Sequence, residues 1–556
     1  MKNLIGETVV ITGAGHGIGR ELAIQLASLG CIVVCWDVDE QANRSTINAI
    51  LEEGGEVYGY LVDVSNRLEV RETVRMMRKN SIPEVTILIN NAAILIQRPF
   101  LEQNYEDVEK TFDVNVLSNF WTIEAFLPTM LQNGRGHVVS MCSMCGMYGV
   151  AQKVAYCSSK YAVRGLMDGI REEFRHHPSK PKIHFTTIYP FYVDTGLAED
   201  PKYRFPYLFR AATPKYAAEE VIRALRRNYN EFTIPRCLFP LNTVHRFFPS
   251  SEASRWLHFY TFSVLFFQRN FMLVPVREEV LVSSPRIGSA SSVAWLYLVA
   301  EFLIGAAFSG FLAFLGLVKS VLPQPPRDLT GDVALVTGAT STLGRCLAEE
   351  FARSGCTIVC VDSEVNAVRE TAREIASRYP RVEGIAPDHR KQDAASEFKA
   401  RVHGYACDLW DRHAIRGVAK RVKDEVGSID VLVTCAGNSG QDIFDTVNTT
   451  LMSHYWTVLA FLPSMLRLRR AHIVGVTPTA STEDAYAGSR AAIAGLMESL
   501  GHEFGTRNSQ LNFITVAPKA DPRFVVAHAK EVVEAVRRNQ CNLNANWCST
   551  ILYRIR

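Results

Sequence analysis

The sequence has little net charge, no regular cysteine spacing and no basic stripe interleaved with aromatic residues. Its 60 Lys and Arg against 57 Asp and Glu leave a formal charge of +3, which does not favour a nucleic-acid partner. Among its 13 cysteines, Cys142 and Cys145 form a Cys-x-x-Cys pair, but no second pair or histidine cluster completes a metal site. The stretch before the first predicted strand is too short for a secretory signal. We therefore expect no metal, no nucleic acid and cysteines in a reducing compartment.

A strand–turn–helix–strand pattern opens the chain. The β-branched run 8–11 leads into a glycine-rich turn, residues 20–29 have a helical pattern, and residues 31–36 form a second apolar strand. This order is typical of a dinucleotide-binding unit, in which glycines let the backbone approach a pyrophosphate at a helix N-terminus. The predicted contacts in the turn are Thr12, Gly13, Gly15, His16, Gly17, Ile18 and Gly19.

An acidic residue, Asp37, follows the second strand directly. Its carboxylate can accept hydrogen bonds from the adenosine ribose and would repel a 2′-phosphate, so the sequence favours NAD over NADP. Later strand ends add three candidate cofactor contacts. They are Asp63 near the adenine ring, its neighbour Val64, and Asn90.

A proton-transfer site is predicted around Tyr156 and Lys160. The two residues are four positions apart, which places them on one face of a helix. A nearby ammonium favours the phenolate, so we expect the pKa of Tyr156 to move toward neutrality. Ser143 follows an apolar strand and can bring a hydroxyl beside the tyrosine. The alternative is that the pair lies on an ordinary solvated helix face.

From about Gly6 to Pro190 the chain resembles a short-chain dehydrogenase/reductase. The resemblance rests, in order along the chain, on the glycine turn, Asn90-Asn91-Ala92-Ala93, Asn115, Ser143 and the Tyr156/Lys160 pair. Ala93 stands where the family usually has glycine. The amino-acid sequences of the turn and of the Tyr156 helix are similar to those of one branch of this family. That branch holds the membrane-bound retinol dehydrogenases and the 17-beta-hydroxysteroid dehydrogenases of types 11 and 13.

The resemblance implies a role for each catalytic candidate. Tyr156 would act as acid and base, and Lys160 would lower its pKa and hold the nicotinamide ribose, so both also belong to the cofactor site. Ser143 would orient the substrate oxygen, and Asn115 would support a water relay to Lys160.

Aromatic residues follow Pro190, where the family has its substrate loop. They predict an apolar pocket, although core or membrane-contacting residues would have the same composition. The residues are Phe191, Tyr192, Leu197, Tyr203, Phe205, Tyr207, Leu208 and Phe209.

An almost wholly apolar segment, Val293–Val318, precedes a proline-rich linker. At about 1.5 Å per residue it reaches roughly 39 Å as a helix, enough to cross a membrane core of about 30 Å once. It can span, or dip as a hairpin near Gly305 or Gly310; a buried soluble helix is the remaining alternative. The apolar stretch Trp256–Phe267 is too short to span.

The dinucleotide-binding pattern then begins again, which makes this a tandem repeat. Phe126-Leu127-Pro128 recurs as Phe461-Leu462-Pro463, and Asp362 occupies the position of Asp37. The chemistry is not repeated. The replacements in the second copy are Thr340 for Gly15, Thr342 for Gly17, Thr434-Cys435 for the Asn pair, Thr450 for Asn115, Pro478 near Ser143 and Arg490 for Lys160, although Tyr486 is kept. We predict a pseudoenzyme domain.

The sequence therefore predicts an α/β protein with two tandem Rossmann-like domains, each a doubly wound parallel sheet, joined by a membrane-type helical segment. Its predicted parts are an active dehydrogenase domain (1–233), an apolar extension (234–290), a membrane segment (291–322), a linker (323–330) and a degenerate dehydrogenase domain (331–556).

Domain 1 is predicted to interconvert a lipid-like alcohol (retinoid, steroid or long-chain) and its carbonyl with NAD, NADP being disfavoured, in a direction that the sequence leaves open. The alternative is a catalytically idle lipid-binding or scaffolding protein. We expect membrane association at the endoplasmic reticulum or lipid droplets, with the catalytic domain in the cytosol.

The preserved helices suggest why a degenerate copy is kept. Family members usually dimerise through the helices that carry the Asn and the Tyr/Lys positions, and these repeat well here: Trp121-Thr122 recurs as Trp456-Thr457. We expect either an intramolecular pseudo-dimer of the two domains, two independent domains, or a homodimer.

Overall fold

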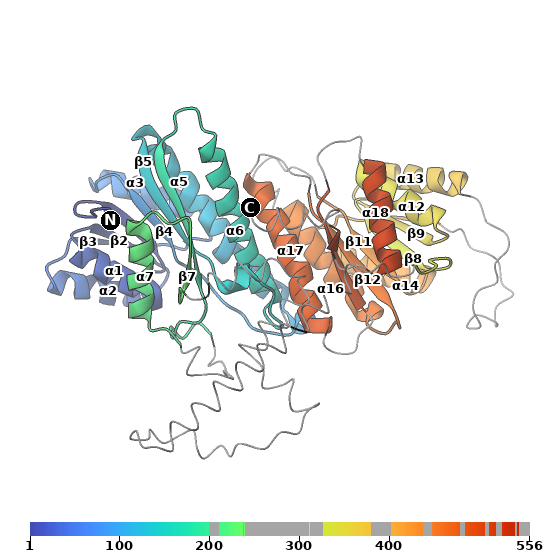
Figure 1. Cartoon of the computed structure of the whole chain (residues 1–556), viewed down its shortest axis with the longest axis horizontal. Coiled ribbons are helices and arrows are strands. Elements are labelled where there is room, and N and C mark those ends of the chain that lie inside the picture. Colours follow the sequence, from blue (N-terminus) through green and yellow to red (C-terminus); the bar gives the residue numbers. More distant parts are fainter. Residues whose placement is uncertain are drawn as a thin grey trace, which may run out of the picture.

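The computed structural model describes residues 1–198, 211–236, 238, 311, 326–379, 402–437, 448–478, 484–505, 511–518, 525–539 and 542–543. These residues form two α/β domains, each built on a seven-stranded parallel sheet with helices on both faces (Figure 1). The prediction of two tandem Rossmann-like domains is therefore confirmed.

The sheet of domain 1 has the strand order β3-β2-β1-β4-β5-β6-β7. Strand order reverses between β1 and β4, and such a switch point leaves a crevice at the carboxyl ends of the strands. The glycine turn follows β1, Asn90 ends β4 and Ser143 follows β5, so all three meet at this edge. The strands are β1 (Thr8–Thr12), β2 (Ile32–Asp37), β3 (Val57–Leu61), β4 (Ile87–Asn90), β5 (Arg135–Met141), β6 (Lys182–Pro190) and β7 (Glu231–Ile234).

Burial on both faces explains why these strands are continuous apolar runs rather than alternating ones. Every residue of β1 and of β4 is buried. The helices that cover the sheet carry their apolar residues on one side. They are α1 (Gly17–Ser28), α2 (Glu40–Glu52), α3 (Arg67–Lys79), α4 (Tyr105–Phe112), α5 (Ser118–Gln132), α6 (Val154–Arg175) and α7 (Pro214–Arg226).

Domain 2 repeats this topology with the order β10-β9-β8-β11-β12-β13-β14. Its strands are β8 (Val333–Thr337), β9 (Thr357–Asp362), β10 (Val402–Ala406), β11 (Val431–Thr434), β12 (Ala471–Val476), β13 (Leu511–Val516) and β14 (Asn542–Leu543). Its helices are α12 (Thr342–Arg353), α13 (Val365–Arg378), α14 (Arg412–Glu425), α16 (Ser453–Met465), α17 (Asp484–Gly505) and α18 (Val525–Arg538).

Helices α6 and α17 lie side by side where the two domains meet (Figure 1). Small residues allow their backbones to approach closely. A Cβ on Gly165 would lie 2.4 Å from the carbonyl oxygen of Ala487, and one on Gly495 would lie 2.6 Å from the ring of Tyr161. One continuous apolar cluster includes buried residues of both domains. The domains are therefore packed against each other in this structure.

Aromatic contacts extend this junction from α6 to the preceding helices. Phe100 of domain 1 packs against Tyr455 of α16 with ring centroids 5.3 Å apart, and Tyr105 packs edge-on against Trp456 at 5.1 Å. Arg412 of α14 lies over Tyr105 and pairs with Glu106 at 3.3 Å. Helices α4, α14 and α16 thus belong to the contact surface.

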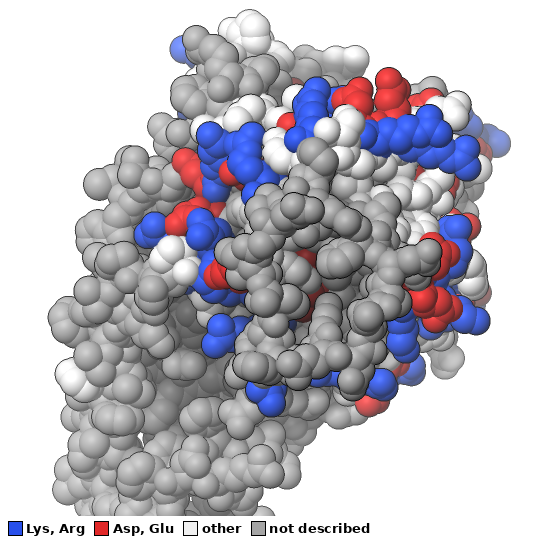
Figure 2. All heavy atoms as spheres, turned by 90° about the vertical axis from the view of Figure 1, so that its right-hand side faces the viewer, with Lys and Arg blue, Asp and Glu red and all other residues white. Residues whose placement is uncertain are grey.

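Charges of both signs occur among the described residues of one face of the molecule. Figure 2 shows Lys and Arg interspersed with Asp and Glu among the described residues of that face. This distribution agrees with the near-balanced sequence, because no described part of the face forms a broad single-sign surface.

None of the helices in the described part of the chain is long and apolar enough to cross a membrane. The predicted membrane segment Val293–Val318, apart from Phe311, lies outside the described residues, as does the stretch Trp256–Phe267. All ten cysteines in the described ranges are free thiols.

Candidate active site

The glycine turn between β1 and α1 is shaped for a close backbone approach. Gly13 and Gly17 have φ of 66° and 52°, a left-handed conformation that favours glycine. A Cβ on Gly15 would lie 2.8 Å from the Cβ of Ala42, and one on Gly19 would overlap the carbonyl oxygen of Gly13. Side chains at these positions would close the turn, so the predicted role of the glycines fits their geometry.

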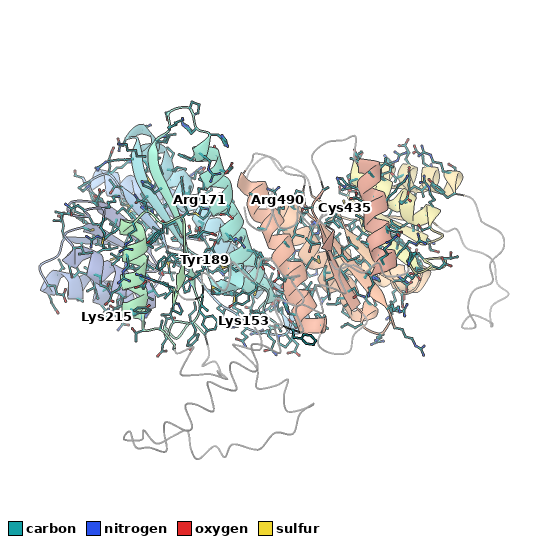
Figure 3. The ribbon with its side chains drawn as sticks, viewed as in Figure 1. Lys153, Arg171, Tyr189, Lys215, Cys435 and Arg490 are labelled. Atoms are coloured by element: carbon teal, nitrogen blue, oxygen red, sulfur yellow. The ribbon has the colours of Figure 1, made fainter. Side chains whose placement is uncertain are left out.

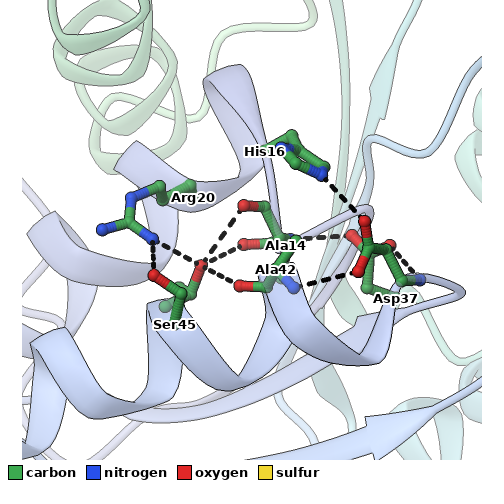
Figure 4. A network of polar contacts seen from close by, with 9 residues as sticks. Ala14, His16, Arg20, Asp37, Ala42 and Ser45 are labelled. Atoms are coloured by element: carbon green, nitrogen blue, oxygen red, sulfur yellow. Dashed lines mark hydrogen bonds and ion pairs between the residues drawn. The ribbon is translucent and has the colours of Figure 1, made fainter.

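The N-terminus of α1 keeps its backbone N–H groups free of a side-chain cap. His16 occupies the N-cap position and makes no capping hydrogen bond. Its ring instead lies 3.3 Å from the carboxylate of Asp39 (Figure 4). Uncapped N–H groups and the helix dipole together form a site for an anion such as a pyrophosphate.

The carboxylate of Asp37 lies directly beside this turn. One oxygen accepts a hydrogen bond from the Gly15 N–H at 2.7 Å, and the other accepts one from the Asp39 N–H at 2.9 Å (Figure 4). Both oxygens retain lone pairs for further donors. Arg20 is held by α2, where it donates to Ser45 at 3.1 Å. Asp37 can therefore accept hydroxyl donors at the end of β2.

The two asparagines at the end of β4, Asn90 and Asn91, make different contacts, and the sequence predicted only Asn90 as a site residue. The Asn90 side chain is buried and its oxygen accepts a hydrogen bond from Thr122 at 2.8 Å. Asn91, which sequence reasoning did not select, donates to the carbonyl oxygens of Thr12 at 3.0 Å and Gly13 at 3.1 Å. Asn91 thus fixes the glycine turn, and a cofactor contact of Asn90 stays a prediction.

The other predicted contacts at the strand ends lie beyond β3. Asp63 accepts hydrogen bonds from the backbone and the hydroxyl of Ser65 at 2.9 and 2.6 Å, and Val64 is buried. Their predicted contact with an adenine ring stays a prediction. Ile18 packs on the apolar cluster under α1, and Thr12 is buried at the end of β1.

Three of the four catalytic candidates, Ser143, Tyr156 and Lys160, meet at the carboxyl end of β5. Ser143 follows this strand, and its Oγ accepts a hydrogen bond from the Cys145 N–H at 3.1 Å. Tyr156 and Lys160 are 7% and 2% exposed on α6. The Lys160 Nζ lies 5.7 Å from the Tyr156 ring centroid and donates to the Met141 carbonyl at 2.9 Å. A buried pair excludes the alternative of a solvated helix face.

The pKa of Tyr156 does not move toward neutrality in this structure. Burial raises the pKa of the phenol well above its usual value, with a further rise from the charge of Cys145, while hydrogen bonding with Ser143 lowers it. Burial lowers the pKa of Lys160 to about 8. The expectation from spacing alone was wrong for this state, because it neglected the cost of charging a phenol away from water.

Asn115 lies in a π-helical turn, Asp113–Leu117, between α4 and α5. Such turns commonly occur at functional sites. Its oxygen accepts the Ile94 N–H at 2.8 Å, and its nitrogen donates to the Ser159 Oγ at 3.1 Å. Ser159 in turn donates to the Tyr156 carbonyl at 2.7 Å. Ser159 was missed by sequence reasoning, and its place between Tyr156 and Lys160 was the available signal.

An apolar cluster adjoins the catalytic residues. It contains Met144, Met147 and Tyr148 from the loop after Ser143, and Phe191 packs against it. Leu197 is exposed, and Tyr192 is partly buried. The remaining predicted pocket residues lie outside the described ranges: Tyr203, Phe205, Tyr207, Leu208 and Phe209.

The equivalent turn of domain 2 is filled by its own side chains. Thr340 donates through both its N–H and its hydroxyl to one oxygen of Asp362, at 2.9 and 2.6 Å. Ser341 caps α12 by accepting the Gly344 N–H at 3.1 Å. The features that fit an anion and a ribose in domain 1 are thus satisfied internally in domain 2.

The catalytic positions of domain 2 also differ. Arg490 stands on α17 in place of Lys160, and Cys435 follows β11 in place of Asn91 (Figure 3). The π-helical turn is kept as Asn448–Met452, but it holds Thr450, whose buried hydroxyl has no partner in the described part of the chain. The backbone of the site is therefore preserved while its polar side chains are replaced.

Comparison with known proteins places both halves in one family. The family described as short chain dehydrogenase matches residues 7–203, 332–403 and 388–520. The chain is 39% identical over 236 residues to bovine (Bos taurus) short-chain dehydrogenase/reductase family 16C member 6, covering 42% of this chain and 74% of that protein. It is 36% identical over 249 residues to human epidermal retinol dehydrogenase 2 (45% and 80% covered) and 35% identical over 224 residues to human 17-beta-hydroxysteroid dehydrogenase 13 (40% and 72% covered). The branch resemblance predicted from sequence is confirmed.

Proposed function

Because this chain belongs to the short chain dehydrogenase family, we propose that its first domain is an NAD-dependent dehydrogenase of lipid-like alcohols. The observation that carries the proposal is the buried group of Ser143, Tyr156 and Lys160 at the same sheet edge as the uncapped α1 turn. A bound nicotinamide dinucleotide supplies the hydride acceptor for the alcohol, or the donor for its carbonyl.

The chain's own residues provide the proton chemistry. The Tyr156 phenolate takes the proton from the alcohol oxygen and becomes the hydroxyl; in the reverse direction the Tyr156 hydroxyl donates its proton to the carbonyl oxygen. Ser143, which follows β5 and lowers the pKa of Tyr156, orients the substrate oxygen. Lys160 is anchored 5.7 Å from the Tyr156 ring and stabilises the phenolate when the ammonium is charged. Asn115, through Ser159, fixes the start of the catalytic helix.

Asp37 supports the choice of NAD. Its carboxylate is fixed by two backbone donors and would accept the ribose hydroxyls but repel a 2′-phosphate. The test compares kcat/KM for NAD and NADP, with Asp37→Ala as the variant. We expect NAD to be preferred and the preference to shrink in Asp37→Ala. A preference of the unaltered chain for NADP would contradict the assignment.

The substrate class is inferred from the apolar cluster beside the site. Met144, Met147 and Tyr148 offer no charged group to a substrate, and relatives named after retinol and 17-beta-hydroxysteroids support an apolar alcohol. A panel of retinoid, steroid and long-chain alcohols, assayed by NADH formation, tests this. We expect turnover within the panel; NAD binding without turnover of any member would favour the idle lipid-binding alternative.

Domain 2 is proposed to be a non-catalytic partner that packs on domain 1 as a subunit would in a dimer. The side-by-side α6 and α17 and the shared apolar cluster support this arrangement. The measurement is the mass of the chain in detergent by light scattering. We expect one chain per particle, because the second half already occupies the surface that a partner would need.

We also propose that the chain associates with membranes through Val293–Val318. The support is the length and apolarity of that sequence. The intact chain should sediment with microsomes of the endoplasmic reticulum or float with lipid droplets, and deletion of residues 291–322 should release it into the soluble fraction. An intact chain that stays in the supernatant would contradict this.

A further inference from the structure

Glu503 of α17 crosses the domain boundary and binds two separate loops of domain 1. One of its carboxylate oxygens accepts the backbone N–H of Phe100 at 2.7 Å, and the other accepts that of Gln152 at 3.0 Å. Glu503 is only 5% exposed. A buried carboxylate is stable only when its oxygens are hydrogen-bonded, and here both bonds come from the neighbouring domain.

Glu498, from the same helix, makes a second pair of bonds. It accepts the Gly149 N–H at 3.2 Å and the Tyr161 hydroxyl at 3.0 Å. The loop that contains Gly149, residues 144–153, also rests directly on α17, because a Cβ on Gly149 would lie 2.6 Å from the backbone nitrogen of Ser499. The two glutamates therefore hold the loop at two points, three residues apart.

The loop in question, residues 144–153, joins Ser143 to the helix of Tyr156. It carries Met144, Met147 and Tyr148 of the apolar cluster. Gln152 has a φ of 63°, a left-handed backbone conformation that is strained for a residue other than glycine. Its carbonyl accepts the Arg98 N–H at 3.0 Å, so Glu503 stabilises a strained turn and ties it to the loop after β4.

We call the contacts of Glu498 and Glu503 with domain 1 the clamp. The repeated helix α6 makes no equivalent contacts with domain 2 among the described residues. The repeat places Asp168 and Glu173 of α6 at the positions of Glu498 and Glu503. Asp168 pairs with Arg171 at 2.8 Å within its own helix, and Glu173 is exposed. Within the described residues, then, α17 reaches the loops of domain 1 while the matching positions of α6 do not reach domain 2.

We propose that Glu498 and Glu503 are positioning residues for the active site of domain 1, supplied by the degenerate domain. They hold the loop between Ser143 and Tyr156 in the conformation that orients the substrate alcohol. The catalytic part of this inference rests on the function proposed above. It explains why domain 2 keeps α17 although its own Lys position is Arg490.

The test uses the intact chain with Glu503→Gln and Glu498→Gln, and Glu173→Gln as the matched control on the repeated helix. Glu503→Gln can accept one N–H but presents an NH₂ group to the other, so it loses about half of the contact. Glu498→Gln is the milder variant, because its NH₂ group can donate to the Tyr161 hydroxyl while its oxygen accepts the Gly149 N–H. Hydrogen–deuterium exchange of peptides spanning 96–104 and 147–155 reports on the contact independently of catalytic turnover. Steady-state kinetics with the alcohol, and NAD binding by calorimetry, read its consequence.

We expect exchange in the 96–104 and 147–155 peptides to accelerate at least fivefold in Glu503→Gln, while peptides of α6 stay protected. We expect kcat/KM for the alcohol to fall roughly tenfold or more, since small displacements of positioning groups have large effects on rate, and the Kd for NAD to change less than twofold. Glu173→Gln should resemble the unaltered chain in all three measurements.

Unchanged exchange in both glutamine variants would overturn the clamp. Faster exchange with unchanged kcat/KM would overturn its catalytic role, as would an equal loss of alcohol turnover and NAD affinity, which indicates general destabilisation. If the unaltered chain turned over no alcohol of the panel, the proposed function would fail; the exchange measurement would still decide whether the two glutamates hold the loops.

Discussion

The two domains have the same strand order but differ in how the turn after their first strand is hydrogen-bonded. In domain 1 the α1 N-terminus has no side-chain cap, and among the described residues the Asp37 carboxylate is bonded only to backbone N–H groups. In domain 2 Ser341 caps α12, and the Thr340 hydroxyl binds Asp362. Capping and internal hydrogen bonds stabilise a helix start, whereas a binding site leaves these groups for its ligand. The difference supports the proposal that domain 2 is non-catalytic, because its own side chains satisfy the polar groups that stay available in domain 1.

The largest effect is expected at Tyr156, the proposed acid and base. Tyr156→Phe removes the hydroxyl that transfers the proton, and we expect kcat to fall by about 10³-fold while NAD binding is kept. The equivalent change in domain 2, Tyr486→Phe, should leave kcat within twofold. Steady-state kinetics on both variants make the comparison. A similar loss of kcat in both variants, or no loss in Tyr156→Phe, would contradict the proposed difference between the two domains.

The next effect concerns the glycine turn. Gly15→Thr copies domain 2 into domain 1, and its Cβ would lie 2.8 Å from Ala42 while its hydroxyl reaches Asp37. We expect the Kd for NAD to rise more than tenfold, measured by calorimetry. Thr340→Gly is the mirror control and should not change NAD binding. Undiminished affinity in Gly15→Thr would show that the turn is not the cofactor site.

The interface between the domains gives a stability prediction. Gly165→Val places side-chain atoms where a Cβ already lies 2.4 Å from the Ala487 carbonyl. We expect the free energy of unfolding to fall by about 1–3 kcal/mol, measured by urea denaturation. Gly501→Ala is the control on α17, because its nearest neighbour is 3.9 Å away. Equal stabilities of the two variants would mean that the helices do not pack closely.

A smaller, pH-dependent effect separates the domains at one buried position. The repeat places His454 of domain 2 where domain 1 has Asn119, and burial lowers the pKa of His454 to about 4. The unfolded chain, with a histidine pKa of about 6.5, binds more protons between these values, so folding stability falls as the pH drops from 6.5 to 4.

His454→Asn should therefore reduce the acid sensitivity of the chain. At pH 5 the buried histidine costs about 2 kcal/mol relative to neutral pH, and the variant should lose less stability than the unaltered chain between pH 7 and pH 5. Urea midpoints at both pH values test this, with exposed His413→Asn as the control. Parallel losses in all three proteins would refute the assignment.

The fold and the positions of Ser143, Tyr156 and Lys160 at one sheet edge were predictable because they depend on local pattern, while their catalytic roles stay a prediction. Apolar runs, glycine turns and the Tyr156/Lys160 spacing lie close together in sequence. The pKa of Tyr156 was not predictable, since it depends on burial by distant elements. The role of Asn91 rather than Asn90 in fixing the turn depends on which way each side chain leaves β4. Glu498 and Glu503 act across two domains, and no spacing within either domain marks them.

The most direct test of this account is the number of NAD molecules that one intact chain binds. Calorimetric titration should give one site per chain, and that site should disappear in Gly15→Thr but persist in Thr340→Gly. This result would place all cofactor binding in domain 1. Two sites per chain, or one site that survives Gly15→Thr, would contradict the account.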